Sequence, residues 1–276
     1  MTVVAACQLS LAIGDPDGNL AAAAGAVESA AAAGAGLVVL PELCDSGYVF
    51  RDAAEARTLA RPAADSAALR QWQALAARHH TVIAGGFCEL GPDGRLFNSA
   101  ALVDDSGVRA VYRKAHLWDA EKLIFTPGAD APPVVGLSLG RVSVMICYDL
   151  EFPEWVRLPA LDGAQLLCAP VNWPAYPRPN GERPAEVVRV QADAAVNRML
   201  IAVCDRIGDE RGVAWVGGSV IVDADGWPLA GGSASAEAAT FLAECDLGTA
   251  LDKAVSPHND ALGDRRPELY GRVADA

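Results

Sequence analysis

A cysteine between a predicted strand and a predicted helix is the residue of this 276-residue chain best suited to covalent chemistry. The run Val142 to Ile146 is apolar and rich in β-branched residues, which predicts a buried strand ending at Cys147. Pro153 suits the first turn of the following helix, because an N–H is not needed there. A thiol on such a turn can attack a carbonyl group while the next backbone N–H groups stabilise the oxyanion. The alternative is a small buried apolar residue, a common environment for a free cysteine.

Two charged residues at the ends of other predicted strands could complete such a site. Glu42 follows the strand Leu37 to Leu40, and Lys114 follows the strand Val108 to Tyr112. Strand ends are where α/β enzymes place catalytic groups, although each residue alone could equally be a solvated charge. A thiol nucleophile needs a base or a lowered pKa, and Glu42 is a candidate base. Lys114 could stabilise negative charge on a reacting oxygen. His116 is a second candidate base, in a cysteine–histidine pair.

These three segments, in this order, resemble the nitrilase superfamily of carbon–nitrogen hydrolases over nearly the whole chain. The matching motifs are Leu-Pro-Glu around Glu42, Tyr-Arg-Lys-Ala-His-Leu around Lys114, and Cys-Tyr-Asp-Leu-Glu-Phe-Pro-Glu beginning at Cys147. Further similarity lies in Phe-Thr-Pro-Gly at 125–128, Asp-Gly-Ala at 162–164 and Asn-Arg at 197–198. One short motif would be weak evidence, whereas three ordered motifs with these flanks are specific.

The resemblance implies an α/β fold, a four-layer αββα sandwich, and a role for each residue. Glu42 would be the general base, Lys114 the stabiliser of the tetrahedral intermediate, and Cys147 the nucleophile that forms a thioester. Glu121 occupies the place of a second glutamate of the family, where it would orient Lys114 or the substrate. His116 matches a structural position. No cofactor and no metal are expected.

The hydrophobic pattern favours one α/β domain of layered sheets covered by helices. The predicted strands are 3–9, 37–40, 81–88, 99–103, 108–112, 134–139, 142–146, 165–169, 200–204, 218–222 and 240–245. The predicted helices are 20–33, 66–79 and 185–198, with one more beginning at Pro153. No linker divides the chain, so residues 1–250 are expected to form the hydrolase domain. The polar residues 251–276 are expected to form a C-terminal arm, either mobile or lying across a partner subunit.

The charge balance argues against nucleic-acid and membrane partners. The chain has 22 basic and 35 acidic residues, a net charge of −13, and no basic patch that would bind nucleic acid or an anionic membrane. The alanine-rich stretch 21–33 contains Glu28, which argues against a membrane span. The first residues open directly into a strand and lack a signal-peptide pattern, so a soluble cytoplasmic protein is expected.

The cysteine and histidine counts argue against disulfides and zinc. Seven cysteines are present, with no Cys-x-x-Cys spacing, and disulfides are rare in reducing compartments. Five of them lie in or beside apolar strand-like runs and are predicted to be packing residues, namely Cys7, Cys88, Cys168, Cys204 and Cys245. The four histidines include no pair at helical i,i+4 spacing, which argues against a zinc site.

The residues after the cysteine favour an amidase. True nitrilases of the family usually have tryptophan and glutamate there, whereas this chain has Tyr148-Asp149. Omega-amidases commonly have arginine at the position of Glu151, and that arginine is associated with anionic substrates. A carboxylate at Glu151 would repel such substrates, so neutral or amine-bearing amides are expected, as in the similar 5-aminopentanamidases and N-carbamoylputrescine amidases. Glu151 could equally form a salt bridge within a dimer.

Three further residues are predicted to line the substrate pocket. Tyr48 lies on the loop after Glu42, and Asn172 and Trp173 follow a predicted strand, where aromatic walls and a few polar groups are typical of a binding site. The Tyr148 backbone N–H is predicted to bind the oxyanion. The resemblance also implies a homodimer or larger homo-oligomer. The alternatives are an N-carbamoyl amine hydrolase, an omega-amidase, a nitrilase, or a non-catalytic thiol or binding protein.

Overall fold

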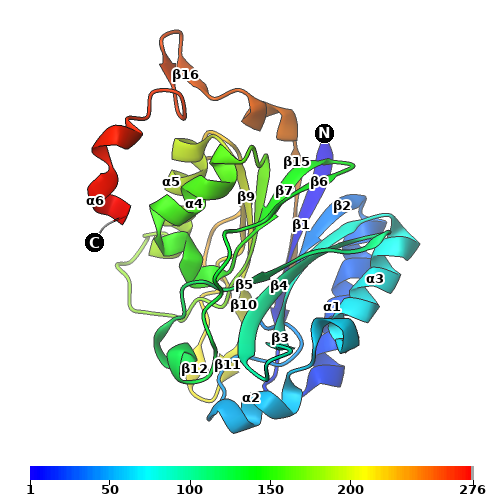
Figure 1. The fold of residues 1–276 in the computed structure, drawn as a ribbon. Coiled ribbons are helices and arrows are strands. Elements are labelled where there is room, and N and C mark those ends of the chain that lie inside the picture. Colours follow the sequence, from blue (N-terminus) through cyan, green and yellow to red (C-terminus); the bar gives the residue numbers. More distant parts are fainter. Residues whose placement is uncertain (275–276) are drawn as a thin grey trace.

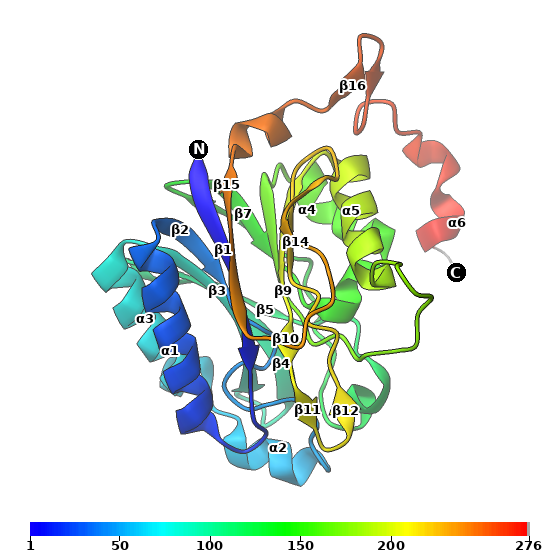
Figure 2. The ribbon, with the colours of Figure 1, turned by 180° about the vertical axis from the view of Figure 1, so that it is seen from behind.

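The protein folds into two sheets that lie face to face between two outer layers of helices (Figures 1 and 2). The structure, a computed structural model, describes residues 1–274. Its four layers confirm the αββα sandwich expected from the sequence.

The first sheet has the strand order β10-β1-β2-β3-β4-β5, and β15 pairs antiparallel with β1. The pairs β1–β2 and β2–β3 are parallel, whereas β3, β4 and β5 form an antiparallel meander. The strands are β1 (Thr2–Ser10), β2 (Ala35–Val39), β3 (Val82–Leu90), β4 (Leu96–Asp104), β5 (Gly107–Arg113), β10 (Arg206–Ile207) and β15 (Ala239–Cys245).

The second sheet has the order β14-β13-β9-β8-β7-β6, with β7, β8 and β9 parallel. Its strands are β6 (Val134–Leu137), β7 (Gly140–Val144), β8 (Leu166–Pro170), β9 (Leu200–Cys204), β13 (Val220–Val222) and β14 (Pro228–Gly231). Two small hairpins lie outside both sheets, one of β11 (Asp209–Glu210) and β12 (Val213–Ala214), the other of β16 (Ala254–Ser256) and β17 (Asn259–Asp260).

The helices cover the outer faces of the two sheets. Helices α1 (Pro16–Ala32) and α3 (Ala67–His79) lie on the first sheet, and α4 (Pro153–Leu161) and α5 (Ala185–Asn197) lie on the second (Figures 1 and 2). The short α2 (Ala53–Leu59) and α6 (Gly271–Ala274) lie at the periphery. Among the helices of residues 1–274, none combines the length and the apolar character that crossing a membrane requires.

Successive side chains of β1 point to opposite faces of the sheet and therefore pack into two separate cores. Val4 and Ala6 face the layer between the sheets, whereas Ala5 and Cys7 face α1 and α3. Because both faces are covered, the strand is apolar without interruption from Val3 to Cys7, which is typical of parallel strands inside an α/β sandwich.

The strand before Cys147 is shorter than predicted. β7 ends at Val144, and Cys147 opens a short 3₁₀ helix, η3 (Cys147–Glu151). The backbone N–H of Ile146 donates to Asp149 Oδ2 at 3.1 Å, so the chain has already left the strand ladder at that point. The sequence pattern missed this because Met145 and Ile146 are buried as completely as strand residues.

Several peripheral elements were not predicted, and the first helix begins earlier than predicted. Helix α1 begins at Pro16 and not at residue 20, and Asp15 caps it by accepting from Gly18 N at 3.0 Å. Helix α2 buries only Ala56, so it leaves no apolar stripe in the sequence. The strands β10, β11, β12, β16 and β17 have two or three residues each, too few for a periodic pattern.

The C-terminal arm contacts the second helical layer. After the 3₁₀ helix η4 (Leu247–Leu251), Lys253 Nζ donates to the carbonyls of Asn197 and Arg198 at 3.1 and 2.7 Å. These two carbonyls lie at the end of α5, where a cation is favoured because the helix dipole is negative. The rest of the arm, with a second 3₁₀ helix η5 (Pro267–Leu269), runs beside α4 and α5 (Figure 1).

A close approach between β3 and the segment after β2 fixes the position of Glu42. A Cβ atom on Gly86 would lie 2.5 Å from Leu43 N and 2.6 Å from Glu42 Cα. We expect Gly86→Ala to lower the free energy of unfolding by about 1–3 kcal/mol, since backbone must move to admit the methyl group. Gly25→Ala, in α1 with open space around it, is the matched control and should raise stability by up to about 1 kcal/mol. Urea unfolding of both variants measures the difference; equal effects would contradict the close approach.

Candidate active site

A lysine between two glutamates forms the centre of the site. Lys114 follows the end of β5, and its side chain is completely buried. Its Nζ lies 2.7 Å from Glu42 Oε1, and 3.0 and 2.8 Å from the two carboxylate oxygens of Glu121. Glu42 is also fully buried, and Glu121 is 4% exposed. The predicted glutamates and lysine therefore meet in one charged cluster.

A fourth residue of this cluster was not predicted. Asn98, on β4, donates through Nδ2 to Glu42 Oε1 at 2.7 Å and to Glu121 Oε1 at 2.8 Å. An uncharged double donor holds the two carboxylates together without adding charge. Asn98 had little signal in the sequence, because it lies just before the predicted strand 99–103, whereas β4 begins at Leu96.

Cys147 lies at the start of η3 in a backbone conformation with φ of 46°, which is unusual for a residue other than glycine. Its side chain is buried, and Sγ lies 3.8 Å from the carbonyl oxygen of Asn172. Asn172 in turn donates through Nδ2 to the Glu42 backbone carbonyl at 3.0 Å. The loop after β8 therefore connects the thiol to the glutamate.

The local charges determine the protonation state of each group. Burial raises the pKa of Cys147 well above its usual value, Glu42 adds to the increase, and Lys114 opposes it. Burial also raises the pKa of Glu42 to about 7, against the attraction of Lys114. For Lys114, burial lowers the pKa, but Glu121 and Glu42 together raise it well above the usual value. At neutral pH the lysine is charged, the thiol holds its proton, and Glu42 is near its midpoint.

The structure assigns His116 to a structural role. Its Nδ1 lies 2.7 Å from Asp149 Oδ1, and its ring stacks on Phe152 with centroids 3.8 Å apart. Asp149 is completely buried and also accepts from the Tyr112 hydroxyl and the Ile146 N–H. Sequence reasoning missed Asp149, which stabilises the turn that presents Cys147.

Four of the five predicted binding residues line one pocket with Cys147. They are Tyr148, Glu151, Asn172 and Trp173, and the pocket is narrow, about 40 Å³. The remaining walls, which were not predicted, are Trp118, Pro174, Tyr176 and Glu186.

The fifth predicted residue, Tyr48, lines a neighbouring cavity of about 260 Å³ beside Glu121. Its ring contacts Trp215 edge to face, with centroids 5.4 Å apart. Burial and the nearby carboxylates Glu121 and Glu42 raise the Tyr48 pKa, so its hydroxyl is protonated. The two cavities share Trp118, Pro174 and Tyr176 as walls, so Tyr48 lies in a cavity that adjoins the thiol pocket.

A buried ion pair holds the Tyr48 loop. Glu210 Oε2 accepts from the backbone N–H groups of Tyr48 and Val49 at 2.8 and 2.6 Å. The other oxygen of Glu210 lies 3.0 Å from Arg206 Nη2, and the Arg206 guanidinium stacks over Trp215 at 5.0 Å. The hairpin formed by β11 and β12 thereby positions a loop from the other sheet.

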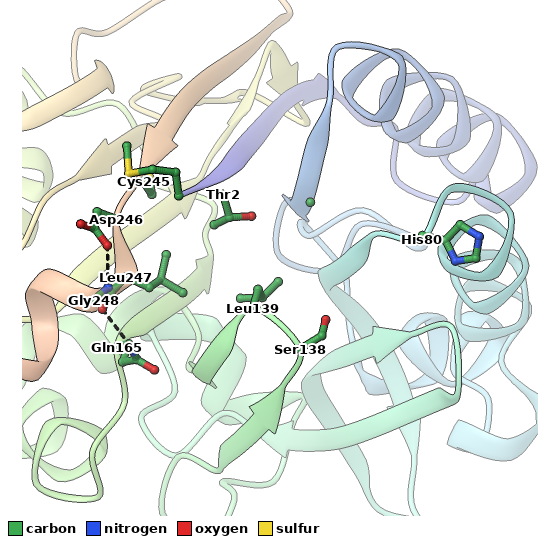
Figure 3. Close-up of a pocket in the computed structure, with 11 residues that line it drawn as sticks. Thr2, His80, Ser138, Leu139, Gln165, Cys245, Asp246, Leu247 and Gly248 are labelled. Carbon is green, nitrogen blue, oxygen red and sulfur yellow. Dashed lines mark hydrogen bonds between the residues drawn. The ribbon is translucent and has the colours of Figure 1, made fainter.

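A larger cleft lies elsewhere and shares no residue with the Cys147 pocket. It has a volume of about 440 Å³ and is lined by residues such as Thr2, Ser138 and Asp246 (Figure 3). Two hydrogen bonds join its lining residues: Gln165 Nε2 donates to the Leu247 carbonyl at 2.8 Å, and Gly248 N donates to Asp246 Oδ1 at 2.9 Å (Figure 3). All seven cysteines are free and buried, as predicted for the five packing residues. Within residues 1–274, no three His, Cys, Asp or Glu side chains cluster as metal ligands.

An αββα sandwich with a cysteine, a lysine and glutamates at its strand ends defines a class of carbon–nitrogen hydrolases. The carbon–nitrogen hydrolase family model matches residues 3–252. The chain belongs to this family and lies in the amidase branch of the nitrilase superfamily.

Three relatives show the extent of the similarity. A nitrilase of Pyrococcus abyssi is 35% identical over 274 residues, covering 99% of this chain and 100% of that protein. An (R)-stereoselective amidase of a Pseudomonas species is 32% identical, covering 87% of this chain and 82% of that protein. The solved structure of an amidase variant from Nesterenkonia sp. AN1, with acrylamide added to its active-site cysteine, is 28% identical with a TM-score of 0.80. It covers 99% of this chain and 100% of that one.

The buried Glu210 should matter more for stability than Glu55 of α2, a more exposed glutamate. Glu210→Gln leaves the buried Arg206 without a charge partner, and we expect about 1–3 kcal/mol of lost stability. Glu55 pairs with Arg211 over the same loop but is 22% exposed, so Glu55→Gln should cost less than about 1 kcal/mol. Thermal unfolding of both variants at one pH measures this; a larger loss in Glu55→Gln would contradict the assignment.

Proposed function

We propose that the protein is an amidase that hydrolyses the C–N bond of small aliphatic amides to an acid and ammonia. The observation that supports this most directly is the Lys114 ammonium, held between two carboxylates beside a buried thiol. This arrangement supplies a nucleophile, a base and a fixed positive charge without a metal ion.

The reaction begins when Cys147 Sγ attacks the amide carbon while Glu42 accepts the thiol proton. A C–S bond forms, and the carbonyl oxygen becomes an oxyanion stabilised by Lys114 and the Tyr148 backbone N–H. Glu42 then gives its proton to the nitrogen, the C–N bond breaks, and ammonia leaves a thioester on Cys147. Water attacks the thioester with Glu42 again accepting a proton, and the acid leaves as the thiol regains its proton.

Glu121 acts through Lys114 in this scheme. Both of its oxygens lie within 3.0 Å of Lys114 Nζ, and it also accepts from the Trp118 N–H at 2.7 Å. It keeps the ammonium in place and has no free oxygen for a substrate proton. Glu121 is therefore a positioning residue, and Glu42 is the base.

Other substrates would use the same chemistry. An N-carbamoyl amine or an omega-amide offers the same carbonyl and leaving nitrogen, so both remain alternatives. A nitrile is favoured by the names of some relatives, such as the Pyrococcus abyssi nitrilase, but Tyr148-Asp149 differs from the usual nitrilase motif. A non-catalytic role is disfavoured because the charged cluster is intact.

The surface and the cysteines suggest assembly and location. A groove of about 730 Å³ between α4 and the C-terminal arm exposes apolar side chains, among them Trp155, Leu161 and Tyr270. We propose that this face takes part in a homodimer or larger homo-oligomer, with residues 1–250 as the hydrolase domain and 251–276 as an arm at the interface. Seven free cysteines favour a reducing compartment, and we propose the cytoplasm.

Ammonia release by purified protein tests the function directly. The substrates are propionamide, 5-aminopentanamide, glutaramate, N-carbamoylputrescine and propionitrile, with kcat/KM measured for each. Cys147→Ala should abolish release, whereas Cys168→Ala, which removes a buried thiol from β8, should keep activity within about threefold. Undiminished release by Cys147→Ala would rule out the nucleophile.

The pH dependence tests the base. Glu42 must be ionised to accept the thiol proton, and its pKa is raised to about 7, so kcat/KM should fall as pH decreases through that value. Glu121 contributes to the raised pKa of Glu42, so Glu121→Gln should move the acid limb to lower pH. Rates from pH 5 to 9 with propionamide, which does not titrate there, give both profiles. A flat wild-type profile below pH 7 would exclude Glu42 as the base.

A further inference from the structure

Two carboxylates line the Cys147 pocket, and only one of them has a cationic partner in the described part of the chain. Glu151 and Glu186 both line it. Glu151 Oε1 lies 3.1 Å from Arg189 Nη1, with both side chains about one third exposed. In the described part of the chain, Glu186 has neither a salt bridge nor a side-chain hydrogen bond, so its negative charge is not compensated within the pocket.

Glu186 lies at the beginning of a helix. It occupies the first turn of α5, at the positive end of that helix dipole. Val187 and Val190 of the same helix are buried against the second sheet, so the helix backbone that bears Glu186 is fixed. The backbone of Glu186 is therefore part of a packed helix, although the preceding loop 174–184 has little regular structure.

The other walls are suited to a cation. Four aromatic side chains line the pocket, namely Trp118, Tyr148, Trp173 and Tyr176. The Trp118 and Tyr148 rings meet edge to face with centroids 4.8 Å apart, so they form two sides of a corner. Aromatic faces attract an ammonium group through their negative quadrupole, and a carboxylate beside them adds a charge-assisted hydrogen bond.

We propose that Glu186 determines specificity by binding the ammonium group of a linear, amine-bearing amide, an inference that rests on the proposed amidase function. The amide end lies at Cys147 and the amine end at Glu186, and the narrow pocket accepts an unbranched chain between them. Glu151 contributes less than its charge suggests, because Arg189 neutralises it. An anionic substrate would have to displace Glu151 from Arg189 while facing Glu186.

Glu186→Gln tests the assignment, with Glu182→Gln as the matched control from the exposed part of the neighbouring loop. The substrates are 5-aminopentanamide and pentanamide, which differ only in the amine. We expect Glu186→Gln to raise KM for 5-aminopentanamide by about tenfold or more and to leave kcat/KM for pentanamide within about twofold. Glu182→Gln should change neither substrate. Arg189→Gln, which frees the charge of Glu151, should lower KM for 5-aminopentanamide.

Equal effects of Glu186→Gln on both substrates, or no effect on either, would overturn the proposal. A wild-type preference for glutaramate would also overturn it. Calorimetric binding of the same two amides to Cys147→Ala separates this inference from the proposed function. If the wild type releases no ammonia but Cys147→Ala binds the amine in a Glu186-dependent manner, the amidase function fails and the ammonium site stands. If neither amide binds preferentially while ammonia is released, the ammonium site fails and the amidase function stands.

Discussion

The buried ion cluster around Lys114 is the constraint on which the rest of the structure depends. One ammonium and two carboxylates lie out of contact with water, and such charges are tolerated only when paired at hydrogen-bond distance. Removing one partner of a buried pair typically costs about 3–5 kcal/mol. The cluster carries one more negative than positive charge when both carboxylates ionise. Burial raises the pKa of Glu42, and the neighbouring carboxylate of Glu121 adds to the increase.

Residues from both sheets form the site. Glu42, Asn98 and Lys114 come from the first sheet, whereas Cys147 and Asn172 come from the ends of β7 and β8 in the second. Packing of the sheets brings the two groups together, so the site exists only in the assembled sandwich. The close approach of Gly86 to the backbone fixes the position of Glu42, and Asp149 stabilises the turn on which the Cys147 thiol lies.

The sequence predicted the reacting groups better than the groups that support them. Glu42, Lys114 and Cys147 could be found because each follows an apolar strand within a distinctive motif. Asn98, Asp149 and Glu210 could not, because their roles depend on contacts with partners far away in sequence; Glu210 binds Tyr48, 162 positions away. The strand before Cys147 was predicted too long because burial, which both strands and turns can have, was its only signal.

The pocket residues that lie near the cysteine in sequence could also be predicted, whereas contacts between distant segments could not. Tyr148 and Glu151 lie beside the cysteine in sequence and do line its pocket, but the pairing of Glu151 with Arg189 on α5 has no local signal. Tyr48 was placed in the thiol pocket because its loop starts at Glu42. Its side chain lines the adjoining cavity, which shares Trp118 and Tyr176 with the thiol pocket.

The central claim is that the reaction passes through a thioester on Cys147, formed with the help of the charged cluster. The most direct test is how this thioester partitions between reaction with water and reaction with hydroxylamine. Propionamide and ethyl propionate would be converted in the same hydroxylamine concentration, and the ratio of propionate to hydroxamate measured for each. One thioester common to both substrates predicts the same ratio, because the leaving group has departed before the partition. Ratios that differ with the leaving group would show that no common acyl-enzyme forms, and would contradict the account.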